Sequence, residues 1–464
     1  MRAVARHRAG WGRLAVVAVV LAAGQGAAWA QAGAAAPTGG VLPELVMPAL
    51  PPGAPAPVPV GRPLTLAQAV EIALRNQPQL GAAVAAAQAA AGRTRQTESG
   101  RGPSVSVSAQ GARSGTEQTV GGVSVMAERS SFSTDVSARQ LIYDFGATNA
   151  QVAQARSRER ASGQTLAQTR QDVINQVKQS YYRLLGDQRL LQVQRENVAN
   201  QQAHLELARG LAEGGIAPRS DVVRAETAVA EAVLNLARAQ NTAALSLVNL
   251  NLALGVDVRT PTQVEQTEEA AAGSGAQADL VALALGQRPE ARAARFSLQA
   301  AREALGLAQV SNRPSVFGEA SYGLRGSAVP PSDRSWSFGA GVQWPLFDSG
   351  LTRGRVQEAA AQVRSAEASL RQVEQTVGSE VVGAYLDLQT AEQQVVAAAA
   401  EVTNAQESLR AATGRYAAGR AAYIEVIDAQ NALVTAQTNQ VNALYTVSTS
   451  RAALKRALGL EEGR

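Results

Sequence analysis

Two long stretches of the chain combine a helix-forming composition with the absence of proline. Residues 150–209 and 351–413 are rich in Ala, Gln, Arg, Leu and Val. Proline breaks helix interiors, and none occurs between Pro103 and Pro218 or after Pro345. At 1.5 Å per residue, helices of this length extend roughly 90 Å. The pattern therefore predicts two unusually long helices.

A second helical stretch follows each long one, at 220–254 and 423–458, after a turn that contains glycine. In the first of these stretches, apolar residues recur every seven positions beside a track of small residues. The small residues are Ala225, Ala232, Ala239, Ser246 and Ala253, matched in the second stretch by Ala429, Ala436, Ala443, Ser450 and Ala457. A seven-residue period predicts a left-handed supercoil, and small side chains belong in a close coiled-coil seam. An ordinary amphipathic bundle is the alternative, but the identical small track favours a specific close contact.

Alternation with a period of two predicts two β-hairpins, at 103–143 and 314–346. The strands of the first are expected at 103–111 and 130–143, joined by a polar, glycine-rich loop. The clearest strand is 334–346, where one face carries Trp336, Phe338, Ala340, Val342 and Trp344. Apolar alternation with aromatic residues near strand ends is typical of transmembrane β-strands. A half-buried soluble sheet is the alternative.

Four strands cannot close a barrel by themselves. Open strand edges inside a bilayer would leave backbone groups unsatisfied, at several kcal/mol each. We therefore expect the chain to oligomerise, so that each copy adds four strands to a shared sheet. Because a long helix follows each strand pair, a helical tube is expected to continue the barrel.

The whole pattern is present twice. Asp144-Phe145-Gly146 returns as Asp348-Ser349-Gly350, an offset of 350 − 146 = 204 that holds to the C-terminus. Upstream the offset is 289 − 78 = 211, which pairs Pro78 with Pro289. The first repeat is placed at 64–255, with its helical hairpin at 146–255, and the second at 279–464, with its helical hairpin at 350–459. A linker at 256–278 joins the repeats, and such a duplication predicts pseudo-symmetry.

The N-terminal region has the features of a secretory signal, which we place at 1–30. Arg2 and three further arginines precede a short apolar run at 14–23, and Ala28-Trp29-Ala30 is a small-x-small cleavage site. An N-terminal anchor helix is the alternative, although the apolar run is too short to span a bilayer. Residues 31–63 are rich in Pro, Ala and Gly, which predicts a disordered leader.

Composition excludes several classes of function. There is no cysteine, and beyond the signal the only histidine is His204, for which we expect a solvated or packing role. The formal net charge of +5 falls to 43 − 4 − 38 = +1 once the four signal arginines are removed, so nucleic acid is not an expected partner. Scattered carboxylates such as Asp279 and Glu290 show no catalytic spacing. We therefore expect no enzymatic activity, cofactor or metal site.

In its order of motifs, the chain resembles the TolC family of outer-membrane channel proteins. The residues that carry the resemblance are Leu66–Leu74 with Asn76 and Pro78, Tyr143–Gly146, Leu346–Gly350, Gly214–Val222 and Tyr416–Val426. The resemblance implies a mostly helical fold with a small β part, and a homotrimer in outer-membrane lipid with a twelve-stranded β-barrel continued by a twelve-helix periplasmic tunnel. It also implies a passive exit duct that serves a periplasmic adaptor and an inner-membrane transporter, either a drug efflux pump or the ABC exporter of type I protein secretion. A periplasmic coiled-coil adaptor is the alternative class, which the paired strands and the duplication disfavour.

The resemblance also implies roles for particular residues. The two turns would form an adaptor-docking tip at Gly214, Gly215, Ile216, Ala217, Pro218 and Gly419. Asp221 and Tyr416 match family positions that hold the tunnel closed; the family's arginine partner is replaced by Ala421, and Arg420 stands one place earlier. Glu425 and Asp428 match acidic positions at the narrowest part of the pore, where threefold rings of carboxylates favour cations. For Glu425 the alternative is a simple helix N-terminal acid that is favoured by the helix dipole.

Overall fold

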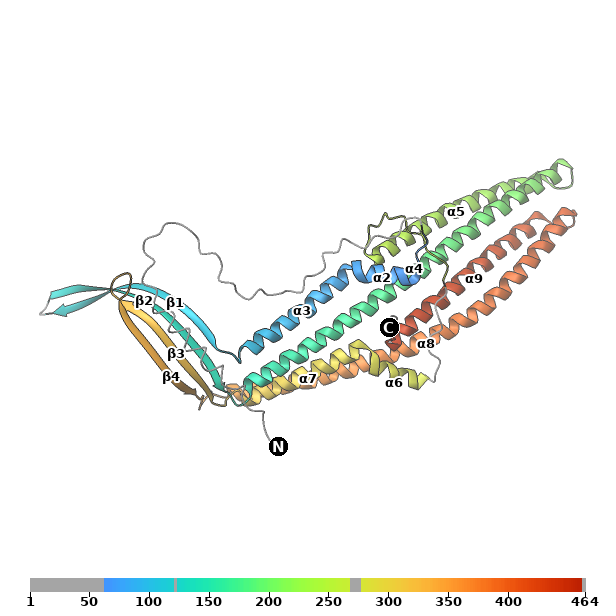
Figure 1. The fold of residues 1–464 in the computed structure, drawn as a ribbon. Helices are drawn as coiled ribbons and strands as arrows, with labels where there is room; N and C mark the ends of the chain where they lie inside the picture. The colour runs from blue at the N-terminus through green and yellow to red at the C-terminus, as the bar shows by residue number, and fades with distance from the viewer. Residues whose placement is uncertain (1–61, 121–122, 268–276, 461–464) are drawn as a thin grey trace, which may run out of the picture. The chain divides into compact units, whose positions relative to one another are not determined.

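The computed structural model describes residues 62–120, 123–267 and 277–460 (Figure 1). In chain order the elements are α2 (Leu66–Asn76), α3 (Pro78–Ser99), β1 (Ser104–Val120), β2 (Val123–Tyr143), α4 (Ala147–Glu213), α5 (Arg219–Leu254), α6 (Gln277–Gln287), α7 (Pro289–Val310), β3 (Ser315–Gly326), β4 (Asp333–Gln343), α8 (Leu351–Ala417) and α9 (Tyr423–Leu458). The order helix, helix, strand, strand, helix, helix therefore occurs twice. The signal predicted at 1–30 lies outside the described residues, as do most of the leader at 31–63 and part of the linker at 256–278.

The chain divides into a sheet unit and a helical unit. The sheet unit comprises Glu98–Thr148 and Asn312–Phe347, and the other described residues form the helical unit. Each unit takes segments from both sequence repeats, because the strands of the two repeats share one sheet. The chain is thus mostly helical with a small antiparallel part, which confirms the predicted fold class.

The sheet is antiparallel, with the strand order β1-β2-β3-β4. β1 and β2 pair from Ser104 with Arg139 to Val120 with Val123, so the loop predicted between residues 111 and 130 is wrong. The alternation rule missed this extension because residues 112–117 form an exposed strand with no apolar face. Cross-strand hydrogen bonds hold it instead, together with an ion pair between Arg113 and Glu128. β4 ends at Gln343, one residue before the last predicted aromatic position.

The two faces of the sheet differ sharply in polarity. One row that crosses all four strands is apolar, and it consists of Val107, Val136, Tyr322 and Trp336. The neighbouring row lies on the opposite face and is made of serines, Ser106, Ser137, Ser321 and Ser337. Its outer pairs are joined by hydroxyl hydrogen bonds of 2.8 Å in both hairpins. Exposure of the apolar face is high, for example 83% at Phe338 on β4.

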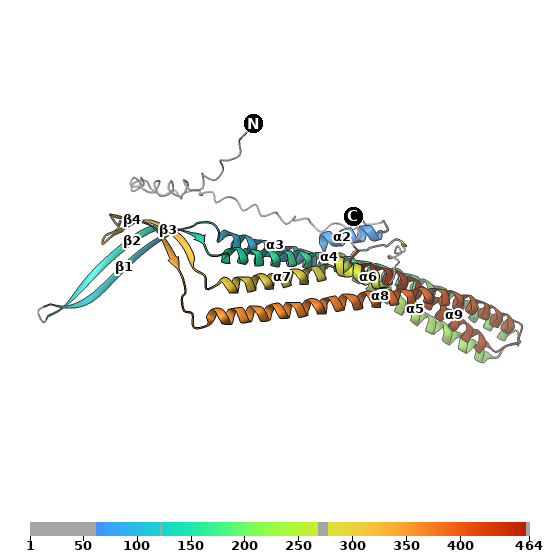
Figure 2. The same ribbon diagram turned by 90° about the horizontal axis from the view of Figure 1, so that it is seen from below.

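The helical unit is built on two antiparallel hairpins, α4 with α5 and α8 with α9 (Figure 2). α4 and α8 are each 67 residues long, which confirms the two long helices; α4 extends the prediction at both ends, and α8 at its C-terminal end only. Most of the predicted small track is buried, with Ala225 and Ala436 fully inaccessible. Among the described residues, no helix is long and apolar enough to cross a membrane.

One buried tyrosine and two glycines hold the short helices of each repeat against the hairpins. The Tyr181 hydroxyl contacts the carbonyl oxygens of Leu64 and Glu265, at 2.8 and 2.6 Å. Gly255 ends α5 with a φ of 70°, and a Cβ there would lie 2.8 Å from the carbonyl oxygen of Asn76. Gly459 ends α9 in the same way, beside the backbone nitrogen of Arg288. Each return helix therefore ends against the junction of the short helices in its own repeat.

A network of five charged side chains joins the two repeats in the helical unit. Arg288 is 2% exposed and pairs with Glu290 at 2.7 Å and with Glu380. Arg456 on α9 pairs with Asp172 on α4 at 2.7 Å, and lies 3.7 Å from Glu380. Burial alone would raise the pKa of Glu290, but the hydrogen bonds from Arg288 outweigh it and lower that pKa.

The repeated Asp-x-Gly motif starts each long helix. The carboxylate of Asp348 accepts hydrogen bonds from the backbone N–H groups of Gly350 at 3.0 Å and Thr352 at 2.8 Å. Asp144 does the same with Gly146 at 3.1 Å and Thr148 at 2.6 Å. The first N–H groups of a helix have no partner within the helix, so these carboxylates satisfy them. The hydrogen bonds with Thr352 are the main cause that lowers the pKa of Asp348.

We predict that Asp348→Ala lowers the thermal midpoint of the protein, because the first turn of α8 loses its acceptor. Asp348→Asn is the intermediate control, since its single amide oxygen can accept only one of the two hydrogen bonds that Oδ1 and Oδ2 of Asp348 accept. Because the pKa of Asp348 is lowered on folding, its stabilisation is complete above pH 3.8 and is lost as the pH falls further. Circular dichroism melts of the three proteins test this, and equal midpoints for Asp348→Ala and wild type would contradict it.

Candidate functional site at the helical turns

The two helical turns have related backbone geometry. In the turn between α4 and α5, Gly215 has a φ of 74°, and the N–H of Ile216 donates to the carbonyl oxygen of Leu211 at 2.9 Å. In the turn between α8 and α9, Gly419 has a φ of 67°, and the N–H of Arg420 donates to the carbonyl oxygen of Arg415 at 2.9 Å. A left-handed residue after a helix is easiest for glycine. This requirement explains why both turns contain glycine.

The structure brings the two turns into contact. A Cβ on Gly419 would lie 3.2 Å from Cγ2 of Ile216, so the second turn passes closely over the first. Ile216 is nevertheless 63% exposed. The predicted tip residues of the first turn, Gly214 to Pro218, therefore lie beside Gly419, which was predicted from the second turn.

Asp221 and Tyr416, predicted as closing residues, are also brought together. Asp221 is 6% exposed at the start of α5, and Tyr416 is 3% exposed at the end of α8. Burial, followed by the nearby charge of Asp221, raises the pKa of Tyr416. The Tyr416 hydroxyl is buried, and it forms no hydrogen bond with any described residue.

A third residue, Tyr423, completes this cluster. It is 1% exposed at the start of α9, and its ring centroid lies 5.1 Å from that of Tyr416, with the planes tilted by 54°. Burial and the neighbouring Tyr416 and Asp221 raise the pKa of Tyr423 to about 12. Its hydroxyl is also buried without a hydrogen-bond partner in the described part of the chain. We call Asp221, Tyr416 and Tyr423 the tip cluster.

All four hairpin helices form the apolar surroundings of the tip cluster. The buried residues are Leu205 and Ala208 on α4, Ala225 on α5, Ala412 on α8, and Val426 and Ala429 on α9. The small alanines come from the seam track and allow the helices to approach closely. The tip cluster thus lies inside the contact between the two hairpins, where separating the hairpins would expose it.

The remaining predicted residues lie outside this cluster. Arg420 is exposed and makes no ion pair with Asp221 or with any other described residue, so it does not replace the arginine missing at Ala421 within one chain. Glu425 pairs with Arg415 at 2.9 Å, and both side chains are about half exposed. Asp428, one helical turn further along α9, is exposed.

Sequence reasoning missed Tyr423 and Arg415. Both lie within or beside the turn motif, and neither matched a position with an assigned role. A signal for Tyr423 was present, because Tyr423, Val426 and Gln430 have the spacing of a buried helix face. The pairing of Arg415 with Glu425 joins two helices across the turn, and helix periodicity carries no information about such a contact.

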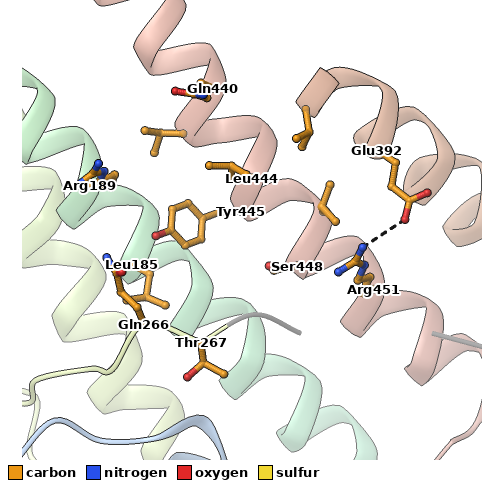
Figure 3. Close-up of a pocket in the computed structure, with 13 residues that line it drawn as sticks. Leu185, Arg189, Gln266, Thr267, Glu392, Gln440, Leu444, Tyr445, Ser448 and Arg451 are labelled. Carbon is orange, nitrogen blue, oxygen red and sulfur yellow. Dashed lines mark hydrogen bonds and ion pairs between the residues drawn. The ribbon is translucent and has the colours of Figure 1, made fainter. Parts of the chain in front are cut away.

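A larger hollow lies away from the turns, between α4 and α9, with a volume of about 840 Å³ (Figure 3). Its walls include Leu185 and Arg189 from α4, Tyr445 from α9, and the linker residue Thr267. Arg451 and Glu392 form an ion pair of 3.5 Å at one side. None of the residues predicted for the pore, gate or tip contributes to this hollow.

Comparison with known proteins identifies the family. Residues 69–256 and 280–460 match the family model described as outer membrane efflux protein. The chain belongs to this family. The probable efflux pump outer membrane protein TtgC of Pseudomonas putida is 26% identical over 367 residues, which cover 77% of this chain and 75% of TtgC. Protein CyaE of Bordetella pertussis is 27% identical over 339 residues, covering 70% of this chain and 69% of CyaE.

Solved structures show the same fold. The outer-membrane channel OprN superposes with a TM-score of 0.76 at 23% identity, over 85% of this chain and 89% of OprN. The outer membrane protein VceC of Vibrio cholerae superposes with a TM-score of 0.74 at 22% identity, over 85% of this chain and 96% of VceC. The resemblance drawn from the motifs is confirmed. As a member of the outer membrane efflux protein family, the chain is an exit duct in the outer membrane of a Gram-negative bacterium, and the adaptor alternative is excluded.

We predict that Tyr423→Phe leaves stability unchanged or raises it, because a buried hydroxyl without a partner is costly and phenylalanine keeps the packing. Tyr423→Ala should cost about 3–5 kcal/mol, as for other large aromatic side chains removed from a core. Chemical unfolding of both variants measures the difference. A clear loss of stability in Tyr423→Phe would show instead that the hydroxyl makes a stabilising hydrogen bond.

Proposed function

We propose that three copies of the chain assemble into a passive conduit, without enzymatic activity, that stays closed at the helical turns until partner proteins dock there. The sheet carries this proposal: a four-stranded sheet with one exposed apolar face and one polar face suits a segment of a larger barrel. The apolar face would meet lipid and the polar face would line the lumen.

The polar face has the character of a water-filled lumen. Arg139 pairs with Glu319 at 3.5 Å, and its guanidinium stacks 4.2 Å from the centroid of the Phe317 ring. Arg325 lies 3.9 Å from Asp135 on the same face. This face therefore carries side chains of both charges. Where β2 and β3 pair, the described residues of the opposite face form no ion pair. A lipid-facing surface could not hold these charges cheaply.

A stripe on α5 supplies a second argument for assembly. The buried face of α5 carries Ala225, Ala232 and Leu250. At 3.6 residues per turn, the opposite side of the helix carries Val223, Leu234, Leu245, Val248 and Leu252. Four of these five are more than half exposed and Val248 is 38% exposed. Exposed apolar side chains that recur along one side of a helix favour an interaction site, and a second copy of the chain would cover them.

The tip cluster is proposed as the latch that holds the turns together. Two tyrosine rings and a carboxylate lie buried between the hairpins, so parting the hairpins exposes them. Their hydroxyls are free to form hydrogen bonds in a rearranged state, since neither has a partner here. Arg420 would act across copies, because it is exposed on its own chain.

Docking of a periplasmic adaptor is proposed at the turns themselves. Ile216 offers an exposed apolar side chain, and the adjacent glycines let a partner backbone approach closely. The adaptor would connect the conduit to an inner-membrane transporter. No described group in the turns offers a substrate pocket, which fits a duct that passes its cargo rather than binding it.

Asp428 is proposed as the main contributor to an anionic ring at the entrance. Glu425 would contribute less than the sequence suggested, because Arg415 compensates its charge at 2.9 Å. Rings of acidic side chains favour cations. In three copies, the ring of Asp428 carboxylates would carry more uncompensated negative charge than the ring of Glu425 carboxylates.

Assembly tests the proposal directly. We expect a detergent-solubilised trimer, and we expect Phe338→Arg to reduce its yield in the outer membrane, because a cation on the lipid face costs about 2–4 kcal/mol at mid-bilayer. Ser337→Arg is the matched control, since the adjacent residue points to the polar face. Light scattering and membrane fractionation measure both. A detergent-free monomer, or equal loss in the two variants, would overturn the proposal.

Selectivity tests the pore assignment. Asp428→Asn should weaken cation preference in a planar bilayer, whereas Arg415→Ala should strengthen it by freeing Glu425. Glu425→Gln alone should have the smaller effect, since its charge is already compensated. Reversal potentials in a salt gradient give each value. Unchanged potentials for Asp428→Asn and Arg415→Ala would show that this part of α9 does not face the lumen.

A further inference from the structure

Next to the tip cluster, on the side away from the turns, the contact between the hairpins contains a layer of polar side chains instead of apolar ones. Asn197 and Gln201 on α4 are 7% and 3% exposed, and Gln430 on α9 is 1% exposed. His204 lies one turn beyond Gln201, half-buried. The spacing of Asn197, Gln201 and His204 is four and three, so one face of α4 presents all of them to the seam. We call these four residues the seam layer.

The seam layer is only partly hydrogen-bonded. The side-chain amide of Gln430 donates to Oδ1 of Asn197 at 3.0 Å. Its other end, Oε1, is buried without a partner, as are Oε1 of Gln201 and Nε2 of His204. A half-satisfied buried network is weaker than an apolar seam of the same shape. The hairpins are therefore held less tightly at this level than at the apolar layers on either side.

His204 is the titratable member of the seam layer. Burial lowers its pKa, and the neighbouring Gln430 amide opposes this in part. The charged side chains near the layer on the packed helices are Arg195, Glu196, Glu206 and Arg209 on α4, Glu226 and Glu231 on α5, Glu407 and Arg410 on α8, and Glu425 and Asp428 on α9. Arg209 pairs with Glu206 and Glu226, Arg410 with Glu407, and Arg415 with Glu425, so arginines compensate these four carboxylates. Burial and Gln430 are the influences that set the pKa of the ring.

We propose that the seam layer is a proton-sensitive contact, in which protonation of His204 drives α4 and α9 apart and favours the open conduit. The inference rests on the proposed closure at the turns. A charged imidazolium at this half-buried position loses part of its hydration, and Oε1 of Gln430 and Oε1 of Gln201 are the unpaired acceptors of the seam layer. Parting the hairpins hydrates the ring, so the open arrangement binds the proton more tightly.

The sign of the pH effect follows from this difference. A histidine whose pKa is lowered in the closed seam stabilises that seam fully above its ordinary pKa of 6.5. The stabilisation is lost as the pH falls through 6.5 and below. Three copies would lose it together, which steepens the response. Acid in the compartment that surrounds the turns would therefore favour opening.

Two measurements on the full-length trimer test the proposal. Because His204 is the only histidine beyond the signal, ring-labelled histidine in a protein with a histidine-free tag gives one NMR titration. We expect its pKa below 6.5. In planar bilayers we expect conductance to rise several-fold between pH 7.5 and 5.5. A pKa at or above 6.5, or a flat conductance profile, would overturn the proposal.

Matched variants separate the seam layer from other titrating groups. His204→Gln keeps a polar side chain that cannot titrate, and its conductance should not respond to pH in this window. His204→Gln combined with Gln202→His moves the histidine to an exposed position on the same helix, and should behave like His204→Gln. If either variant keeps the wild-type pH response, another group is responsible and the proposal is wrong.

A latch variant distinguishes failure of this inference from failure of the proposed closure. Asp221→Ala with Tyr416→Phe should raise conductance at every pH by weakening the tip cluster. If this variant opens the conduit while wild type ignores pH, the closure stands and the seam layer is not a sensor. If it leaves conductance unchanged, the tip cluster is not the latch. The pH responses of wild type and His204→Gln then still show whether the seam layer senses protons.

Discussion

The two outer strands of the sheet impose the constraint on which the rest of the molecule depends. Among the described residues, β1 and β4 each pair on one side only, so each carries a row of free backbone groups. In water such an edge is hydrated, but in hydrocarbon each free group costs several kcal/mol. The apolar row from Val107 to Trp336 commits the sheet to lipid. In the proposed trimer, further copies close these edges, and the same symmetry would repeat every helix and every residue of the turns around one axis.

Periodicity predicted what repeats along one element, and missed what depends on contacts between elements. The long helices and the strand at Phe338 were predictable, because their residues follow a period that one face of an element imposes. The extension of β1 was not, since an exposed polar strand has no buried face to produce alternation. The burial of Tyr423 and the ion pair of Glu425 could not be predicted from periodicity either. Both depend on which helix faces meet across a turn or between hairpins.

The contact between the hairpins combines firm and weak layers. Alanines such as Ala225 and Ala436 let backbones approach closely, which gives dense packing without large side chains. Between these layers, the tip cluster and the seam layer leave buried polar atoms unpaired, at Tyr423 and Gln430 among others. An interior optimised only for stability would not contain such groups. The proposed opening, in which the hairpins part without unfolding, would use this arrangement, because weak layers let the seam open while the helices persist.

Duplication supplies the residues of the proposed latch, and divergence between the repeats gives the two copies different surroundings. Asp221 and Glu425 occupy equivalent positions, since 425 − 221 = 204, yet Asp221 is buried and Glu425 is exposed. The cause lies in their surroundings: Tyr416 and Tyr423 in the second repeat correspond to Ala212 and Arg219 in the first. A carboxylate from one repeat therefore meets rings that only the other repeat provides. The proposed latch can therefore form only between the two hairpins, which is where a closing contact has to act, whereas the second carboxylate, Glu425, pairs with Arg415 outside the cluster.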